Sequence, residues 1–158
     1  MPLSKLAITA AVAIALGAAA FASYAQDIVI TPDPALQGLS NEDATAKRQE
    51  TMKLNGATLK TAGSLTGADA VKAAETLIAD FSNLTELFPE GSDTVKGSEA
   101  KPEIWQNWET FQGLLKQGVV NATAMKAAAE AGDAAAYGAS IKALGGLCGT
   151  CHQQFRAS

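Results

Sequence analysis

Cys148-Gly149-Thr150-Cys151-His152 ends six residues before the C-terminus and contains both cysteines and the only histidine of the chain. This C-x-x-C-H pattern is typical of the attachment site of a c-type haem. On a helix, positions i and i+3 lie on one face, so the two thiols can each add to a vinyl group of the haem. His152 follows directly, and its imidazole can bind the iron as the proximal ligand.

Three other kinds of site can contain two nearby cysteines. A zinc site needs four ligands, and the chain has no second C-x-x-C and no further histidine. A thioredoxin-like redox pair follows a strand at a helix N-terminus, whereas this pair comes late in a helical pattern. A local disulfide would leave His152 without a role. The motif therefore predicts haem attachment.

The first 25 residues have the pattern of a cleavable secretory signal peptide. Lys5 precedes an apolar run from Leu6 to Ala20, and Ser23-Tyr24-Ala25 is a small-x-small cleavage site. An uncleaved membrane anchor is the alternative, but the run is short for a span and rich in alanine. We therefore expect a signal peptide over 1–25, one haem domain over 26–158, and a periplasmic location.

The charge of the chain restricts its partners. The whole sequence has 12 basic and 16 acidic residues, so removing Lys5 with the signal peptide leaves 11 against 16, a formal charge of −5. Such a protein is not expected to bind nucleic acid or an anionic membrane, and basic redox proteins of the periplasm are compatible partners. The sequence has no paired carboxylates and no nucleophile–base set, so a conventional enzyme is not expected.

Apolar residues recur with a helical period in four segments. The first helix begins at a capping box with Ser40 as its N-cap and runs to about Ala62, and the second begins at a similar cap, Thr66. Pro89 ends the second helix after Phe88, and a Gly/Ser-rich loop leads to a third helix with Pro102 in its first turn. Gly132 and Asp133 separate the third helix from the fourth. We expect an all-α, antiparallel up-down-up-down four-helix bundle.

These residues together resemble the class II c-type cytochromes, which comprise cytochrome c′ and its low-spin relative cytochrome c-556. The resemblance covers almost all of the chain after residue 25, and its strongest part is CGTCH near the C-terminus of a helical domain. Phe155-Arg156 is similar to the aromatic-arginine ending of the family. Three further segments are similar to family motifs, namely 47–53, 87–89 and 101–105.

The resemblance implies one haem c per chain, attached to Cys148 and Cys151 with His152 as proximal iron ligand. It also implies that Arg48 lies near a haem propionate and that Arg156 lies near the proximal histidine. For both arginines, a solvated surface charge is the alternative.

Met52 stands at the position where the family divides into two functions. In the c-556 branch, a methionine of the first helix is the distal axial ligand of a low-spin electron carrier. In the cytochrome c′ branch, an apolar side chain there covers a vacant iron site that binds nitric oxide or carbon monoxide. The segment from Met52 to Gly56 is more similar to the c-556 branch, so we expect Met52 to be the distal ligand. Gas binding remains the alternative, and the chain is expected to be a monomer or a homodimer.

Overall fold

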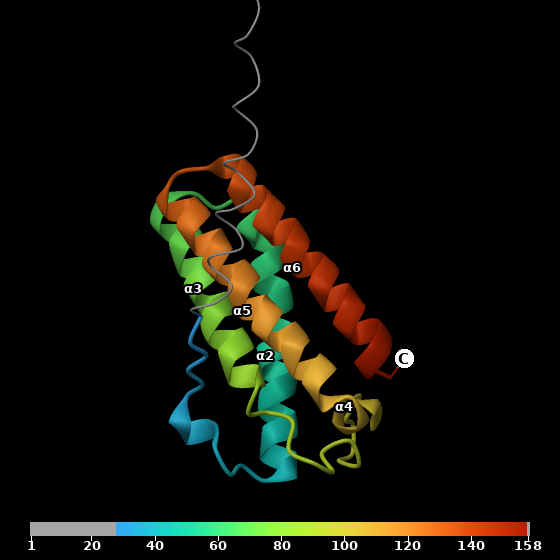
Figure 1. Ribbon diagram of the computed structural model, residues 1–158. Helices are drawn as coiled ribbons and strands as arrows, with labels where there is room; N and C mark the ends of the chain where they lie inside the picture. Colours follow the sequence, from blue (N-terminus) through green and yellow to red (C-terminus); the bar gives the residue numbers. More distant parts are fainter. Residues whose placement is uncertain (1–27, 158) are drawn as a thin grey trace, which may run out of the picture.

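Figure 1 shows the computed structural model, which describes residues 28–157. The predicted signal peptide over 1–25 lies outside the described residues. The elements in chain order are the 3-10 helix η1 Pro34–Leu36 and the α-helices α2 Asn41–Ala62, α3 Gly67–Leu84, α4 Glu103–Gln106, α5 Trp108–Glu130 and α6 Ala134–Phe155.

The four long helices α2, α3, α5 and α6 alternate in direction and lie side by side (Figure 1). The predicted antiparallel four-helix bundle is therefore confirmed. Residues 28–157 contain no strand beyond one isolated bridge between Ala100 and Arg156. None of the helices formed by these residues is both long enough and apolar enough to cross a membrane.

Two of the predicted helix boundaries have the expected capping groups. The Ser40 hydroxyl accepts a hydrogen bond from the Asp43 amide at 3.0 Å and donates one to the Asp43 carboxylate at 2.8 Å. Gly132 has a positive φ of 67°, and the Asp133 carboxylate accepts a hydrogen bond from the Ala136 amide at the start of α6. The predicted capping box at Thr66 is wrong, because its side chain makes no capping hydrogen bond.

Helix α5 is the centre of the bundle, because it packs closely against both α3 and α6. Its buried apolar face, which includes Phe111, Val119 and Met125, meets that of α3, which includes Leu77 and Leu84. Gly118 brings α5 against the ring of Phe81, since a Cβ at this position would overlap that ring. In contrast, α2 and α6 make few direct contacts with one another.

The second and third helices differ from their predicted extents. Helix α3 ends at Leu84 rather than at Phe88, because the Thr85 hydroxyl and amide bond back to Ser82 and the chain then turns away. The predicted third helix is broken at Asn107 into α4 and α5. Trp108, the first residue of α5, is 38% exposed.

The segment between α3 and α4 is held to α2 by a buried arginine. Arg48 is 5% exposed. Its Nη1 donates to the Leu87 carbonyl at 2.9 Å and to the Ser92 hydroxyl at 3.0 Å. Its Nη2 donates to the Ser98 hydroxyl at 3.0 Å, and its guanidinium lies 4.5 Å from the centre of the Phe88 ring. These side-chain contacts therefore hold the long segment between α3 and α4 against α2.

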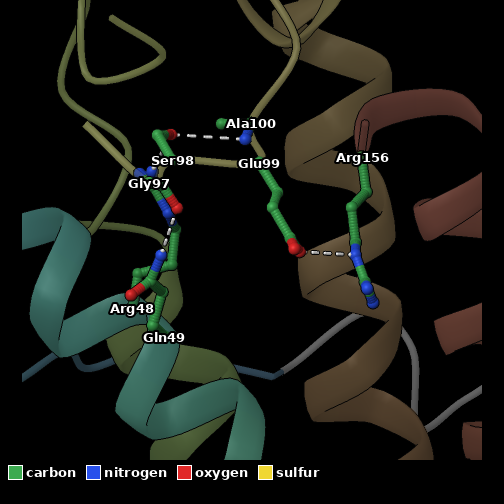
Figure 2. A network of polar contacts seen from close by, with 7 residues as sticks. All are labelled: Arg48, Gln49, Gly97, Ser98, Glu99, Ala100 and Arg156. Carbon is green, nitrogen blue, oxygen red and sulfur yellow. Dashed lines mark hydrogen bonds and ion pairs between the residues drawn. The ribbon is translucent and has the colours of Figure 1, made fainter. Parts of the chain in front are cut away.

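The same loop also reaches the C-terminus. Figure 2 shows Arg48 and Gln49 of α2 on one side of residues 97–100, and Arg156 on the other side. The Glu99 carboxylate pairs with Arg156 at 2.8 Å, and backbone hydrogen bonds join Lys101 to Phe155 and Ala157 to Glu99. Residues 97–101 therefore connect α2 to the end of α6, although these two helices barely touch.

Replacing Arg48 with alanine should destabilise the protein by roughly 3 kcal/mol, because several buried acceptors lose a charged donor at once. Replacing Arg156 with alanine is the matched control. Its ion pair with Glu99 is about half exposed, so the expected loss is below about 1 kcal/mol. Urea denaturation followed by circular dichroism measures both losses, and equal losses would contradict the anchoring role of Arg48.

Asp80 of α3 is partly buried, and its Oδ2 has no hydrogen-bond partner. Burial raises the pKa of this carboxyl to about 6, and attraction to Lys47 opposes the shift. Because the folded-state pKa is above the unfolded one, ionised Asp80 destabilises the folded protein as the pH rises through about 6. Asp80→Asn should therefore raise the unfolding temperature at pH 8 and leave it nearly unchanged at pH 4. A thermal melt at both pH values tests this, and an equal gain at both would refute it.

Candidate functional site

The CGTCH motif occupies the last two turns of α6, at the end of the bundle where α4 and the first half of α2 also lie (Figure 1). Cys148 and Cys151 are both half-buried free thiols, one helical turn apart. His152 is also half-buried. This position late in a helix, with no strand in residues 28–147 before it, is unlike that of a thioredoxin-type cysteine pair.

A cavity of about 480 Å³ separates α2 from the end of α6. This volume is in the range of sites that hold small molecules and cofactors. Its lining residues come from α2, the 88–104 segment, α5 and the C-terminus, and they are Arg48, Gln49, Met52, Lys53, Phe88, Glu99, Ala100, Ile104, Phe111, Cys151, His152, Phe155 and Arg156.

A second, smaller cavity of about 30 Å³ adjoins it deeper in the bundle. It is lined by Met52, Asn55, Phe81, Leu114, Leu115, Leu147, Cys148, Cys151 and His152. Met52, Cys151 and His152 line both cavities, so the two spaces belong to one site. The structure thus brings Met52, predicted from the first helix, to the same site as His152 from the last helix.

The two cavities differ in charge. The larger one has three cationic side chains on its wall, Arg48, Lys53 and Arg156, against the single carboxylate of Glu99. The smaller one is almost entirely apolar. This division matches the two ends of a haem. Its propionate carboxylates need cations, and its hydrophobic ring needs an apolar surface.

Aromatic rings form one side of the larger cavity. The Phe111 ring packs edge-on against Phe88, with centroids 4.6 Å apart, and against Phe155, with centroids 5.3 Å apart. Phe155 directly precedes Arg156, so the aromatic-arginine ending also has a packing role. The exposed Trp108 stacks on the outer face of Phe111 at 5.8 Å.

Burial raises the pKa of the Cys148 thiol and raises that of Cys151 to about 11, where the neighbouring Cys148 adds to the effect. Reactive cysteines of redox enzymes and metal sites instead have lowered pKa values. Both thiols are therefore protonated at neutral pH in the described structure, and this is a further argument against a redox pair.

Burial lowers the pKa of His152, and the positive charge of Arg156 adds to this shift while Glu99 opposes it. The imidazole is thus neutral at pH 7, and a neutral ring nitrogen is the form that binds a metal. Arg156 lines the larger cavity, and its guanidinium is paired with the Glu99 carboxylate.

The residues present fit a haem group. Two thiols one turn apart, a neutral imidazole beside them, an apolar inner cavity and a cationic outer one are all found around the same space. The inner wall also contains Asn55, whose Oδ1 is buried without a hydrogen-bond partner. Arg48 lines the cavity too, but its terminal nitrogens already donate to loop residues and to the Thr45 hydroxyl of α2.

Several site residues were not singled out from the sequence. Lys53 and Glu99 line the larger cavity, and nothing in their local sequence distinguishes them from other surface charges. Gln49 also lines it, and its side chain donates to the Gly97 carbonyl at 2.8 Å. For Asn55 a local signal exists, because a polar residue at a helical spacing from Arg48 and Met52 falls on the inward face of the first helix.

Known proteins similar to this chain come from both branches of the family that the sequence resembles. Cytochrome c′ of Rhodospirillum rubrum is 35% identical over 127 residues, which are 79% of this chain and 84% of that protein. Cytochrome c-556 of Agrobacterium tumefaciens strain B2A is 41% identical over 90 residues, which are 56% of this chain and 71% of that protein.

Solved structures with a similar fold also belong to this family. The solved nitric oxide complex of a cytochrome c prime variant from Alcaligenes xylosoxidans superimposes with a TM-score of 0.67 and 25% identity, over 75% of this chain and 98% of that one. The sequence profile of the family described as cytochrome C′ matches residues 43–156. This chain therefore belongs to the cytochrome c′ family, whose members hold one covalent haem c per chain.

Proposed function

We propose that this protein is an electron-transfer cytochrome of the periplasm, in which His152 and Met52 are the two axial ligands of the haem iron. The observation that carries the proposal is that Met52 and His152, from α2 and α6, line the same two cavities. A methionine–histidine pair gives the iron a raised reduction potential and suits it to reversible one-electron transfer.

In this proposal, the chain holds the haem through thioether bonds from Cys148 and Cys151, on the same helix face as the His152 imidazole. The cationic wall of the larger cavity, formed by Arg48, Lys53 and Arg156, receives the propionates. Arg48 would do so with its remaining Nε–H group, since its terminal nitrogens donate to the loop. Its pKa, lowered by burial to about 10, still leaves it charged at neutral pH.

We also propose where the protein is located and which proteins it contacts. Residues 1–25 direct export, and residues 26–158 form the haem domain. The partners are periplasmic redox proteins that dock near the exposed rim of the larger cavity, where Lys53, Glu99 and Arg156 lie. In this proposal the protein acts as a carrier rather than as an enzyme, and the side chains that line the two cavities hold and shield the cofactor.

A second candidate function is the binding of nitric oxide or carbon monoxide. The apolar cavity of about 30 Å³ beside Met52 has room for a small neutral molecule. One of the similar structures is a nitric oxide complex. In this alternative, Met52 only packs over the distal face of the haem and leaves the sixth iron site free.

Replacing Met52 with alanine distinguishes the two functions. With Met52 as ligand, the ferric wild type is low-spin and has a weak sulfur-to-iron charge-transfer band toward the red end of its absorption spectrum. The variant should lose this band, become high-spin and have a lower reduction potential. A wild-type spectrum that is already high-spin, or a variant spectrum identical to a low-spin wild type, rules out ligation by Met52.

Carbon monoxide added to the ferrous protein tests the gas-binding candidate separately. An open distal site predicts a rapid and complete spectral change in the wild type. Ligation by Met52 predicts that the wild type reacts slowly and that Met52→Ala reacts at least about tenfold faster, because no bond to sulfur must break first. Equal rates for the two proteins would count against ligation and in favour of an open site.

A further inference from the structure

A half-exposed ion pair lies at the larger cavity, which His152 also lines. The Glu99 carboxylate is 2.8 Å from the Nε of Arg156, and both residues line this cavity together with His152. Figure 2 shows the two side chains pointing toward one another, one from the 97–101 segment and the other from the end of the chain. The histidine predicted to bind the iron therefore shares its cavity with two opposite charges that are paired.

The backbone holds both partners of this pair in place. The Arg156 amide donates to the His152 carbonyl at 3.1 Å, which fixes Arg156 one helical turn after the histidine. The Ala157 amide donates to the Glu99 carbonyl at 2.8 Å, and a bridge between Ala100 and Arg156 sets the two segments side by side. Exposed ion pairs are often weak, because the pair itself must order two long side chains. Here the backbone brings the two residues together before their side chains pair.

Both charges reach the imidazole, and they act on it in opposite directions. Arg156 lowers the pKa of His152, and Glu99 raises it. A charge that acts on the ring also acts on an iron bound to that ring, with a strength that falls with distance and with salt. Groups that surround a metal ligand are one of the means by which proteins tune the metal. The pair thus has the position and the signs that such tuning requires.

We propose that Glu99 compensates the charge of Arg156 beside His152 and thereby keeps the reduction potential of the haem iron lower than Arg156 alone would set it. This rests on the proposed electron-transfer function with His152 as ligand, and it does not require ligation by Met52. Reduction adds one electron, which the redox partner supplies, and lowers the positive charge at the iron by one. An uncompensated arginine favours the reduced form, and an uncompensated glutamate favours the oxidised form. Glu99 acts through Arg156 and is thus a positioning residue.

The experiment measures the reduction potential of the haem-loaded protein by spectroelectrochemistry at pH 7 and low salt. Glu99→Gln leaves the arginine uncompensated, Arg156→Gln leaves the glutamate uncompensated, and the double variant removes both charges. Arg156→Lys retains the positive charge. The matched control is Glu75→Gln, because Glu75 and Lys126 form a similar partly exposed pair at 2.9 Å, and neither residue lines one of the two cavities.

Glu99→Gln should favour the ferrous form about threefold, since water screens the charges of a half-exposed pair. At about 59 mV per tenfold change, this is an upward shift of about 30 mV. Arg156→Gln should shift the potential downward by a similar amount. The double variant, Arg156→Lys and Glu75→Gln should all lie close to the wild type. Both shifts should become smaller at about 1 M salt, where the Debye length is about 3 Å.

A merely structural role of the pair predicts a different pattern. Both single variants would then loosen the end of α6 in the same way, and shifts in the same direction would refute the proposal. A potential of Glu99→Gln equal to that of Glu75→Gln would also overturn it. If the shifts are opposite and the wild type is high-spin, ligation by Met52 fails while the role of Glu99 stands. If the wild type shows no reversible one-electron couple, the electron-transfer function fails and this proposal fails with it.

Discussion

The buried guanidinium of Arg48 is the contact on which the haem end of this bundle depends. Helices α2 and α6 must stay apart here, since the space between them is the site, and so they cannot stabilise one another by direct packing. Arg48 instead fixes the loop after α3 to α2, and residues 97–101 of this loop pair with the end of α6 (Figure 2). The open site is framed by a polar network rather than closed by a hydrophobic core.

The protein therefore has two regions, one that supplies most of the hydrophobic core and one that supplies side chains to the site. The α3–α5–α6 packing around Phe111, Leu115 and Val119 supplies the hydrophobic stability of the fold. The less closely packed α2 supplies Arg48, Met52 and Asn55, the side chains that face the site from the opposite direction. Substitutions at these three positions of α2 therefore alter the site and leave the packing between α3, α5 and α6 in place.

The features that could be predicted from sequence are those with local physical causes. The Ser40 and Asp133 caps, the helical periods and the position of CGTCH in the last helix all depend on residues a few positions apart, and the structure confirms them. The path of the loop after α3 depends instead on distant partners. The Leu87 and Phe88 carbonyls are taken by Arg48 and by Trp105, from α2 and α4, and no local pattern indicates such contacts. The same holds for Glu99, whose place in the site comes from its ion pair with Arg156.

The distal face of the haem decides between the two functions known in the family, and relatives from both branches are similar to this chain. Iron-edge X-ray absorption of the ferric protein measures the coordinated atoms directly. We predict five nitrogen neighbours, four from the porphyrin and one from His152, and one sulfur neighbour from Met52. A first shell of nitrogen atoms alone, without sulfur, would contradict the account.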